Sequence, residues 1–443
     1  MSWDAFRKEL FKIALEEGCS FAETYYVQSE SFRVEVLQRQ TDQCSFSDTA
    51  TLGLRVMLGG KSGIACTQAP RDAGELVLRA MDNARCIENK DEVPVQGQMD
   101  IPKVTPPENP LHSLSEQEKV ALCHRLEQET LAADSRIEKV THNVLTTSRS
   151  VRAIHNTLGL AAVEQRMGGM LFVEAAAKDG EEVQQGASFR FKGQALDAVG
   201  CAREAAEKAV ARLGAKPVSA GNYRVLLDSE AAGDLLSAFS SMWSAEAAQK
   251  GLSLLAGKEG ENIAGENITV IDDPLHPLNP RAFDDEGTPA RTTVLIENGR
   301  LLTLMHNLST AKKAGRATTG NAGRPSPASP LGVSPSNFYI APGTDDFDAL
   351  IQKLGDGLVI RGISGLHAGA NAVSGQFSLL AHGQLVEGGR IVRPVDQITV
   401  AGSFLALLNN IEAVGSDLFM QPGGGGLIGS PSLLVKELVV SGR

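Results

Sequence analysis

The sequence predicts an α+β protein with an N-terminal α/β unit, a central α/β unit and a large strand-rich C-terminal domain. Three observations support this prediction. In the first half of the chain, segments with apolar residues at every third or fourth position alternate with segments of period two, which indicates mixed helices and strands. A stretch with five prolines at 91–111 separates two such units. From 218 onward, glycine turns between apolar strands predominate.

The N-terminal unit, residues 1–90, is predicted to contain a helix, strands and a second helix. Trp3, Phe6 and Leu10 lie three and four residues apart and place one apolar face along the first helix. Alternating apolar residues follow, and the glycine pair at 59–60 predicts a turn between two strands. The proline-rich stretch after this unit is assigned to a linker, because that density of proline interrupts both helices and strands.

The central unit, residues 112–217, is predicted to begin with a helix at Ser115. Glu118 lies three residues later and completes the pattern of a capping box. Several short strands are expected between 138 and 192. The segment AREAAEKAVARL, which ends at Leu213, predicts a closing helix.

The C-terminal domain, residues 218–443, is predicted to open with a buried strand that leads into a helix, YRVLLDSEAAGDLLSAFSSMW. Two hairpins are predicted downstream, because Asn298-Gly299 and Gly388-Gly389 each lie between apolar strands. The proline- and serine-rich segment between the hairpins is expected to be an irregular loop.

Near the C-terminus, Gly424, Gly426 and Gly429 satisfy the spacing of a GxGxxG motif. A dinucleotide site needs a strand before these glycines and a helix after them. Here a proline comes just before the glycines, and a second proline and an alternating apolar segment follow. The pattern therefore favours a flexible loop before a last strand.

Composition places the chain among soluble cytoplasmic proteins. It has 443 residues with 42 Lys and Arg against 53 Asp and Glu, and this net charge of −11 argues against nucleic acid as the main ligand. No apolar stretch is long enough to span a membrane, and the acidic, amphipathic N-terminus differs from a signal peptide. The six scattered cysteines include no CxxC pair and are expected to be reduced.

Common catalytic motifs are not found in the sequence. It contains no HExxH or HExxxH zinc helix, no GxSxG elbow and no GxxxxGK[ST] phosphate loop. The acidic run from Asp284 to Glu286 suits either a hard cation or a solvated turn, and its spacing favours the turn. The basic segment that starts at His306 and ends at Arg324 is either a solvated loop or a loop that presents amides and cations to a peptide. Its composition alone favours the solvated loop.

The order of several segments resembles the TldD/PmbA family, and more closely its PmbA (TldE) branch. The segments are LLTLMHNLSTAKKAG at 301–315, TTGNAGR at 318–324, SGQFS at 374–378 and the ending GLIGSPSLLVKELVVSG at 426–442. An early match, GLRVMLGGKSGIA, extends the resemblance over nearly the whole chain. The resemblance implies a three-part chain that dimerises around a cavity. It also implies that a TldD-like subunit holds zinc with HExxxH and a cysteine, and that the pair trims unfolded or extended peptides.

Aligned on the strand before the family's zinc helix, the HExxxH positions of this chain fall on SAFSSM. Ser237 and Met242 then stand at the two histidine positions, and Ala238 stands at the position of the general-base glutamate. Counting back from the EGGRI turn places Leu380 at the cysteine position. None of the four is a normal zinc ligand. The resemblance therefore implies a chain with no catalytic residues and no metal of its own, with zinc in a TldD-like partner.

The resulting hypothesis is a non-catalytic subunit of a TldD-type zinc metallopeptidase, which completes the chamber and binds an extended peptide. The predicted peptide-binding residues are polar groups within the family segments: His306, Asn307, Thr319, Asn321, Arg324, Gln376 and Ser378. An alternative is a self-standing homodimeric peptide-binding protein or regulator without protease activity. A third hypothesis, an enzyme with Ser237, Ser240 or Ser241 as nucleophile, lacks a general base nearby in the sequence.

Overall fold

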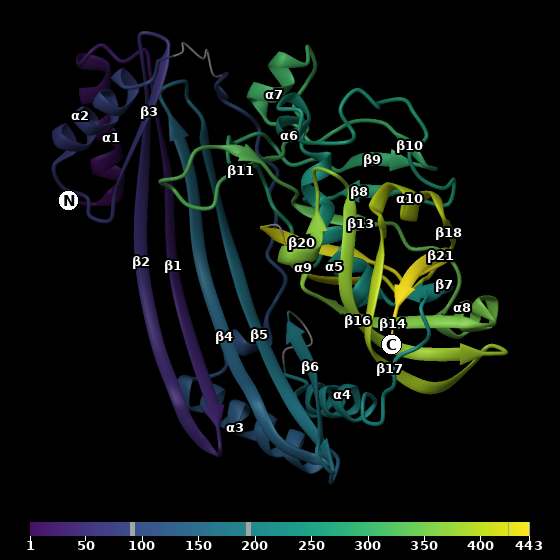
Figure 1. Cartoon of the computed structure of the whole chain (residues 1–443). Coiled ribbons are helices and arrows are strands. Elements are labelled where there is room, and N and C mark those ends of the chain that lie inside the picture. Colours follow the sequence, from purple (N-terminus) through teal and green to yellow (C-terminus); the bar gives the residue numbers. More distant parts are fainter. Residues whose placement is uncertain (89–93, 192–195, 424, 443) are drawn as a thin grey trace.

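The computed structural model describes residues 1–88, 94–191, 196–423 and 425–442. A long, curved sheet from the first half of the chain stands beside the domain formed by the second half (Figure 1). Helices α1 (Trp3–Glu16) and α2 (Ala73–Arg85) cover one end of this sheet, and α3 (Glu116–Ala133) and α4 (Ala198–Val210) cover the other end. No helix in the described part of the chain is long and apolar enough to cross a membrane.

One antiparallel sheet carries the six strands of the first half, in the order β3-β2-β1-β4-β5-β6. They are β1 (Phe21–Leu37), β2 (Gln40–Leu58), β3 (Lys61–Thr67), β4 (Ile137–Asn156), β5 (Ala161–Asp179) and β6 (Glu182–Phe191). Strand β1 pairs with β2 on one side and with β4 on the other, from Glu23 opposite Asn156 to Glu35 opposite Val144. The N-terminal and central units, which the sequence predicts as separate, therefore share one continuous sheet.

The strands of the central unit are longer than predicted. β4 has 20 residues and β5 has 19, whereas the sequence predicts several short strands between 138 and 192. Residue 192 itself lies outside the described residues. Two glycines near the middle of β5 make the apolar alternation look interrupted. At Gly169 a Cβ atom would lie 2.7 Å from the Nδ2 atom of Asn109, so a close approach of that side chain explains the glycine.

The predicted helices of the first half are confirmed. α1 buries Phe6, Leu10 and Ala14 on one face. α3 begins with a capping box, in which the Ser115 hydroxyl accepts the Glu118 N–H and the Glu118 carboxylate accepts the Ser115 N–H. α4 buries its alanine-rich face against the sheet and α3.

The segment between the first two units has no regular structure over most of its length. Residues 94–109 contain neither helix nor strand, and a short 3-10 helix, η1 (Pro110–Ser113), follows. Residues 91–93 of the predicted linker lie outside the described residues. Asn109 caps η1 by accepting the Leu111 N–H at 3.1 Å.

Five strands of the C-terminal domain pair in a closed ring. β14 (Gly357–Ser364) pairs with β7 (Gly221–Leu227) and with β16 (Gln376–Glu387), and β17 (Arg390–Ser403) and β21 (Leu433–Ser441) complete the ring. Alternate apolar residues of these strands fill the inside of the ring. Helix α8 (Phe347–Leu354) packs on the outer side.

A second sheet of the C-terminal domain has the order β10-β9-β8-β13-β20-β19. Its strands are β8 (Val270–Asp272), β9 (Thr293–Glu297), β10 (Arg300–Leu301), β13 (Asn337–Ile340), β19 (Phe419–Gly423) and β20 (Gly426–Ser430). Helix α5 (Ser229–Phe239) contacts β14 of the ring and β19 and β20 of this sheet, so it lies between the two.

Short elements complete the C-terminal domain. They are η3 (Ser240–Trp243), α6 (Ala245–Gln249), α7 (Leu308–Lys313), β11 (Ala322–Gly323), β12 (Gly332–Val333), α9 (Leu366–Gly369), β15 (Ala370–Asn371), α10 (Phe404–Asn409) and β18 (Ile411–Val414). The proline- and serine-rich segment between the two predicted hairpins is irregular apart from β12, as the sequence predicts.

Both predicted hairpins of this domain are present. Asn298 and Gly299, between β9 and β10, have φ angles of 48° and 81°. Gly388 and Gly389, between β16 and β17, have φ angles of 56° and 71°. Asparagine and glycine adopt this left-handed region at low cost, which explains why the dipeptides identify the turns from sequence alone.

The glycine motif near the C-terminus is only in part a loop. Gly424 lies outside the described residues, but Gly426 and Gly429 belong to the buried strand β20. The prediction of a flexible loop is therefore wrong for these two glycines. A Cβ atom on Gly426 would lie 1.7 Å from the Ser336 carbonyl oxygen, so close packing of two strands requires glycine there.

Candidate functional site

Helix α5 begins where β7 ends, and its last turn together with η3 carries the segment SAFSSM that the resemblance aligns with the zinc helix. Asp228 is the N-cap, because its carboxylate accepts the Ala231 N–H at 2.8 Å. Ser237 in the last turn is half-buried, whereas Met242 in η3 is completely buried in the apolar core. Ala238 packs against the same core.

Aromatic packing fixes the orientation of α5. Phe239 stacks on Phe404 with ring centroids 4.5 Å apart, and it meets Phe377 of β16 edge to face. All three rings are part of the core that fills the ring of strands. The apolar side of α5 therefore faces the inside of that ring.

Strand β19 covers another side of α5. The Gln421 side-chain amide donates to the Asp234 carboxylate at 2.7 Å. A Cβ atom on Gly423 would lie 3.5 Å from the Ser237 hydroxyl oxygen. Sequence reasoning did not identify Gln421 or Asp234 as neighbours, because 187 residues separate them and no motif links them.

Leu380 lies on β16 and is exposed, whereas Met242 is buried in the apolar core. The Leu380 side chain is 60% exposed, whereas its neighbours Leu379 and Ala381 belong to the core inside the ring. Because successive strand residues point to opposite faces, Leu380 lies on the outside of the ring. It thus shares the outer face of β16 with His382, which lines a cavity together with residues of α5. The assignment of Leu380 to the third metal position stays a prediction.

The segment that starts at His306 is folded, with buried residues on both sides of an exposed stretch at 312–317, so the solvated loop that composition favours describes only that stretch. His306, Asn307, Thr319 and Asn321 are 3%, 4%, 6% and 2% exposed. The His306 N–H donates to the Thr319 hydroxyl at 2.6 Å, and the His306 carbonyl accepts the Asn321 N–H at 3.1 Å. Burial lowers the pKa of His306, which keeps this imidazole neutral at pH 7.

Two asparagines attach this loop to its surroundings. Asn307 caps α7 by accepting the Thr310 N–H at 2.8 Å, and its amide donates to the Gly332 carbonyl at 3.2 Å. The Asn321 amide donates to the Asp272 carboxylate at 2.7 Å. Burial raises the pKa of Asp272 to about 6 despite this bond. These side chains are occupied by the protein itself and hold the loop in shape.

The acidic run from Asp284 to Glu286 is also buried, so the prediction of a solvated turn is wrong. Asp284, Asp285 and Glu286 are 5%, 4% and 2% exposed. The Asp284 carboxylate accepts the N–H groups of Glu286 and Thr288, both at 2.9 Å. Burial raises the pKa of Asp284 to about 6, and burial beside Asp284 raises the pKa of Glu286 to about 8. Glu286 is therefore largely protonated at neutral pH.

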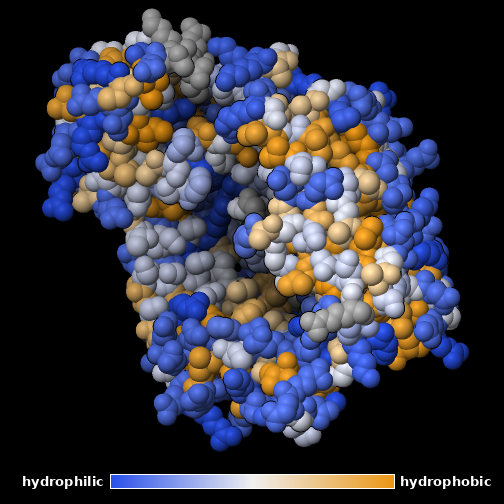
Figure 2. Space-filling model, viewed as in Figure 1, coloured by the Kyte–Doolittle hydropathy of each residue, from blue (hydrophilic) through white to orange (hydrophobic). Residues whose placement is uncertain are grey.

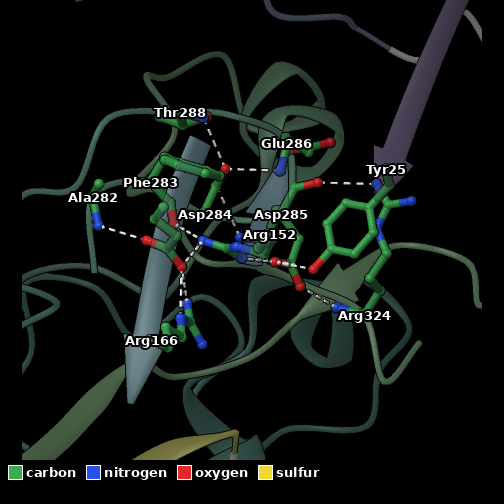
Figure 3. Close-up of polar contacts among 12 residues, drawn as sticks. Tyr25, Arg152, Arg166, Ala282, Phe283, Asp284, Asp285, Glu286, Thr288 and Arg324 are labelled. Atoms are coloured by element: carbon green, nitrogen blue, oxygen red, sulfur yellow. Dashed lines mark hydrogen bonds and ion pairs between the residues drawn. The ribbon is translucent and has the colours of Figure 1, made fainter. Parts of the chain in front are cut away.

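Asp285 joins the C-terminal domain to the long sheet (Figure 3). Arg152 of β4 pairs with its carboxylate, and the Tyr25 hydroxyl of β1 donates to it at 2.9 Å. Arg152 also pairs with Glu164 of β5 at 2.8 Å. Burial pushes the pKa of Asp285 upward, but the Arg152 guanidinium outweighs burial, and the pKa lies below its usual value.

Arg324, a predicted peptide-binding residue, belongs to the same junction. Its guanidinium lies 4.3 Å from the centre of the Tyr25 ring and donates to the Asp285 carbonyl at 2.9 Å. Its side chain also lies 3.7 Å from the Glu23 carboxylate, and both side chains are buried. In this arrangement Arg324 binds the long sheet rather than an external ligand.

Gln376 and Ser378, by contrast, are exposed on the outer face of β16. Both edges of this strand are occupied, by β17 on one side and by β14 and β15 on the other. A peptide therefore cannot extend the sheet at β16, and it would reach Gln376 and Ser378 only through their side chains. Direct peptide contact stays a prediction for these two residues.

A cavity of about 690 Å³ opens further along the same face, beside His382. It lies between α4 and β6 of the central unit and α5, β14 and β16 of the C-terminal domain, and Asp228 and Lys208 line it. Burial lowers the pKa of His382 to about 4 and raises the pKa of Asp228 to about 7. Figure 2 shows the surface hollowed between the sheet and the C-terminal domain.

Three family models match successive parts of the chain. The PmbA/TldA metallopeptidase C-terminal domain matches residues 220–442, the central domain matches 109–213 and domain 1 matches 22–84. The chain belongs to the PmbA/TldD family. The family resemblance inferred from the sequence motifs is thereby confirmed.

Relatives of this PmbA/TldD-family chain carry metalloprotease names. A metalloprotease from Methanothermobacter thermautotrophicus is 30% identical, over 82% of this chain and 81% of that protein. A metalloprotease PmbA homolog from Haemophilus influenzae is 24% identical, over 98% of this chain and 94% of that protein.

Solved structures share the fold of the whole chain. A crystal structure from Thermotoga maritima is 32% identical, with a TM-score of 0.91 over 99% of this chain and 100% of that one. TldE from Thermococcus kodakarensis is 23% identical, with a TM-score of 0.89 over 99% and 100% of the two chains. At 23% identity, the similarity to TldE concerns the fold alone.

The zinc that the PmbA/TldD family implies does not fit the residues of α5. Ser237 is not a normal zinc ligand, Ala238 has no donor atom, and Met242 is buried in the apolar core. Across the residues that the structure describes, no three His, Cys, Asp or Glu side chains are grouped to hold a metal ion.

Proposed function

We propose that this chain is a non-catalytic subunit of a TldD-type zinc metallopeptidase that processes or degrades peptides. In this proposal the zinc and the catalytic glutamate belong to a TldD-like partner, and this chain closes the chamber and helps to hold an extended peptide. The observation that supports the proposal most is α5. The segment that the resemblance aligns with the family's zinc helix forms the end of α5 and η3, and it has Ser237, Ala238 and Met242 at the functional positions.

The packing of α5 explains how the helix persists without ligands. Phe239 and Met242 are fully buried, so the helix contributes core area that a loop could not replace. The cost of losing two such side chains is several kcal/mol, because truncating one buried Phe or Met typically costs about 2–5 kcal/mol. A structural role therefore suffices to retain the helix in a subunit that performs no chemistry.

The surface offered to a peptide is the outer face of β16 and the adjoining cavity. Gln376 and Ser378 supply exposed polar groups on β16, and His382 leads from that strand into the cavity. The buried residues of the predicted set, His306, Asn307, Thr319, Asn321 and Arg324, act in this proposal by holding the neighbouring loop and the domain junction. None of the six cysteines forms a disulfide, which agrees with a proposed site of action in the reducing cytoplasm.

The first test is to isolate the tagged chain from its own cell extract and to identify what co-purifies in equal amount. A partner with HExxxH is the expected result. The isolated chain and the complex are then incubated with zinc and a fluorogenic extended peptide. Cleavage is expected from the complex only, and a chelator is expected to abolish it.

Two outcomes would contradict this proposal. Chelator-sensitive cleavage by the zinc-loaded chain alone would show that it is itself the enzyme. Recovery of the chain only with itself, together with peptide binding but no cleavage, would favour the self-standing homodimeric binding protein.

A further inference from the structure

A pocket of about 220 Å³ lies where α3 begins, on the sheet face that α3 covers. Tyr25 of β1 points toward the C-terminal domain, since its hydroxyl reaches Asp285. Phe32 lies seven positions further along the same strand and therefore points to the opposite face, where it joins the core under α3. The pocket has no lining residue in α5 or β16 and shares none with the cavity beside His382.

Lys119 of α3 places a buried ammonium group in this pocket. The residue is 9% exposed, and its Nζ atom donates to the Thr147 hydroxyl at 3.3 Å and lies 5.3 Å from the centre of the Phe32 ring. It forms no ion pair with a carboxylate of the described residues. A buried ammonium carries three donors and needs compensation, and one hydroxyl and one ring face supply only part of it.

Arg149 of β4 is held beside the same pocket by His112. The Nε2 atom of His112 lies 2.8 Å from the Gly168 carbonyl oxygen, so Nε2 carries the hydrogen and donates it. The Nδ1 atom is then an acceptor, and the Nε–H of Arg149 donates to it at 3.3 Å. Burial lowers the pKa of His112 and thereby maintains this neutral form. With its Nε engaged, Arg149 lines the pocket, and it forms no ion pair with a carboxylate of the described residues.

The charges around the pocket define the ligand it suits. Glu30 and Glu116 also line it, and their charges are opposite in sign to those of Lys119 and Arg149. The pocket has no net charge, because two positive side chains offset two negative ones and the imidazole is neutral. It therefore lacks the excess positive charge that a multiply charged anion would need. A singly charged oxyanion that the two cations can approach together fits best.

We propose that this pocket binds a small carboxylate, such as the C-terminal carboxylate of a short peptide, through Lys119 and Arg149. The carboxylate accepts hydrogen bonds from the Lys119 ammonium and from the terminal nitrogens of Arg149. His112 is a positioning residue that orients Arg149. The proposal does not depend on the proposed peptidase role, because the pocket shares no residue with the surfaces assigned to that role.

The test uses the full-length chain and three probes at equal ionic strength: N-acetylglycine, its uncharged amide N-acetylglycinamide, and inorganic phosphate. Calorimetric titration at pH 7.5 is expected to show binding of N-acetylglycine and none of the amide. Ligand at ten times the Kd is expected to raise the Tm by about 1.5 °C. Phosphate is expected to bind more weakly than N-acetylglycine.

Two variants remove the proposed contacts, and one serves as a matched control. Lys119→Met and Arg149→Gln are each expected to weaken N-acetylglycine binding by about tenfold or more, because each loses a charge-assisted hydrogen bond. Arg33→Gln removes an exposed guanidinium from the opposite face of β1 and is expected to leave the affinity unchanged. Arg149 is exposed, so its variant is expected to fold like the wild type even if the Lys119 variant does not.

Three results would overturn the proposal. The first is equal binding of N-acetylglycine and its amide, or no binding of either. The second is wild-type affinity in Arg149→Gln. The third is tighter binding of phosphate than of N-acetylglycine, which would assign the pocket to phosphate rather than to carboxylate.

Discussion

The Arg152 guanidinium of β4 pairs with the Asp285 carboxylate of the C-terminal domain, and both side chains are buried at the junction between the two halves of the molecule. Arg152 also donates to the Phe283 carbonyl at 2.6 Å and pairs with Glu164 at 2.8 Å. Because these groups are removed from water, each charge depends on the others for compensation. The pair therefore links the position of the long sheet to that of the C-terminal domain.

Replacing Arg152 by methionine is expected to destabilise the chain by about 3–5 kcal/mol, because Asp285 would remain buried without its partner. Urea unfolding followed by tryptophan fluorescence measures this loss. The two tryptophans, Trp3 in α1 and Trp243 in η3, report separately on the two halves of the molecule. Two-state unfolding is not assumed for a chain of this size, so the midpoints of the transitions are compared.

The matched control for this prediction is Arg33→Met. Arg33 pairs with Glu35 at the surface, at 3.0 Å, with the arginine side chain 46% exposed. Exposed ion pairs of this kind contribute little to stability, so the urea midpoint of Arg33→Met is expected to equal that of the wild type. Equal midpoints for the Arg152 and Arg33 variants would contradict the role assigned to the buried pair.

Glu286 predicts a loss of stability as the pH rises. Its pKa is raised from its ordinary value of 4.5 to about 8 in the folded chain, mainly by burial. Between these two values the unfolded chain releases the proton and the folded chain retains it, so unfolding becomes easier as the pH increases. The contribution of Glu286 to the free energy of unfolding is complete below about pH 4.5 and is lost as the pH approaches 8.

Glu286→Gln is therefore expected to flatten the pH dependence of stability between pH 5 and pH 8. The amide keeps the shape of the protonated acid and cannot ionise. The measurement is the change in Tm between these two pH values, compared with the same change in wild type and in the exposed control Glu9→Gln. An unchanged pH dependence in Glu286→Gln would show that the folded carboxyl is already ionised.

Local patterns predicted most elements, whereas long-range contacts determined where the prediction failed. The capping box at Ser115 and the turn at Asn298 each depend on residues within three positions, and both predictions are confirmed. The run from Asp284 to Glu286 reads as a solvated turn because its partners are distant in sequence. Arg152 lies 133 residues before Asp285, and no local sequence pattern predicts that contact.

The candidate site shows the same division. The family resemblance placed Ser237 and Met242 on a helix after a buried strand; the structure has that helix for Ser237, whereas Met242 lies in the 3-10 helix η3 that follows it. Counting from a turn could not show on which face of β16 Leu380 lies, and the strand places it outside the ring. The polar segment with His306 and Asn321 looks solvated from its composition, yet one hydrogen bond within the segment and one to Asp272 allow these two residues to be buried.

Removal of metal is expected to leave the isolated chain unchanged. Ser237, Ala238 and Met242 form no zinc site, so neither a chelator nor added zinc should shift the Tm, and purified protein should contain far less than one zinc per chain. Metal analysis and thermal unfolding, with and without chelator, provide the measurement. A fall of several degrees on chelation would contradict the proposed absence of a metal site in this subunit.

Asn321 and Gln376 separate the structural from the peptide-binding role of the predicted residues. Asn321→Ala is expected to lower stability by about 1–3 kcal/mol, because buried Asp272 and Thr319 lose a hydrogen-bond partner. Gln376→Ala is expected to leave the urea midpoint unchanged, since the side chain is exposed, and to weaken binding of a fluorescein-labelled extended peptide by the assembled complex. Urea unfolding and fluorescence anisotropy measure the two effects on both variants. If Gln376→Ala retained full peptide affinity while Asn321→Ala lost affinity without losing stability, the assignment of β16 as the peptide-facing surface would be wrong.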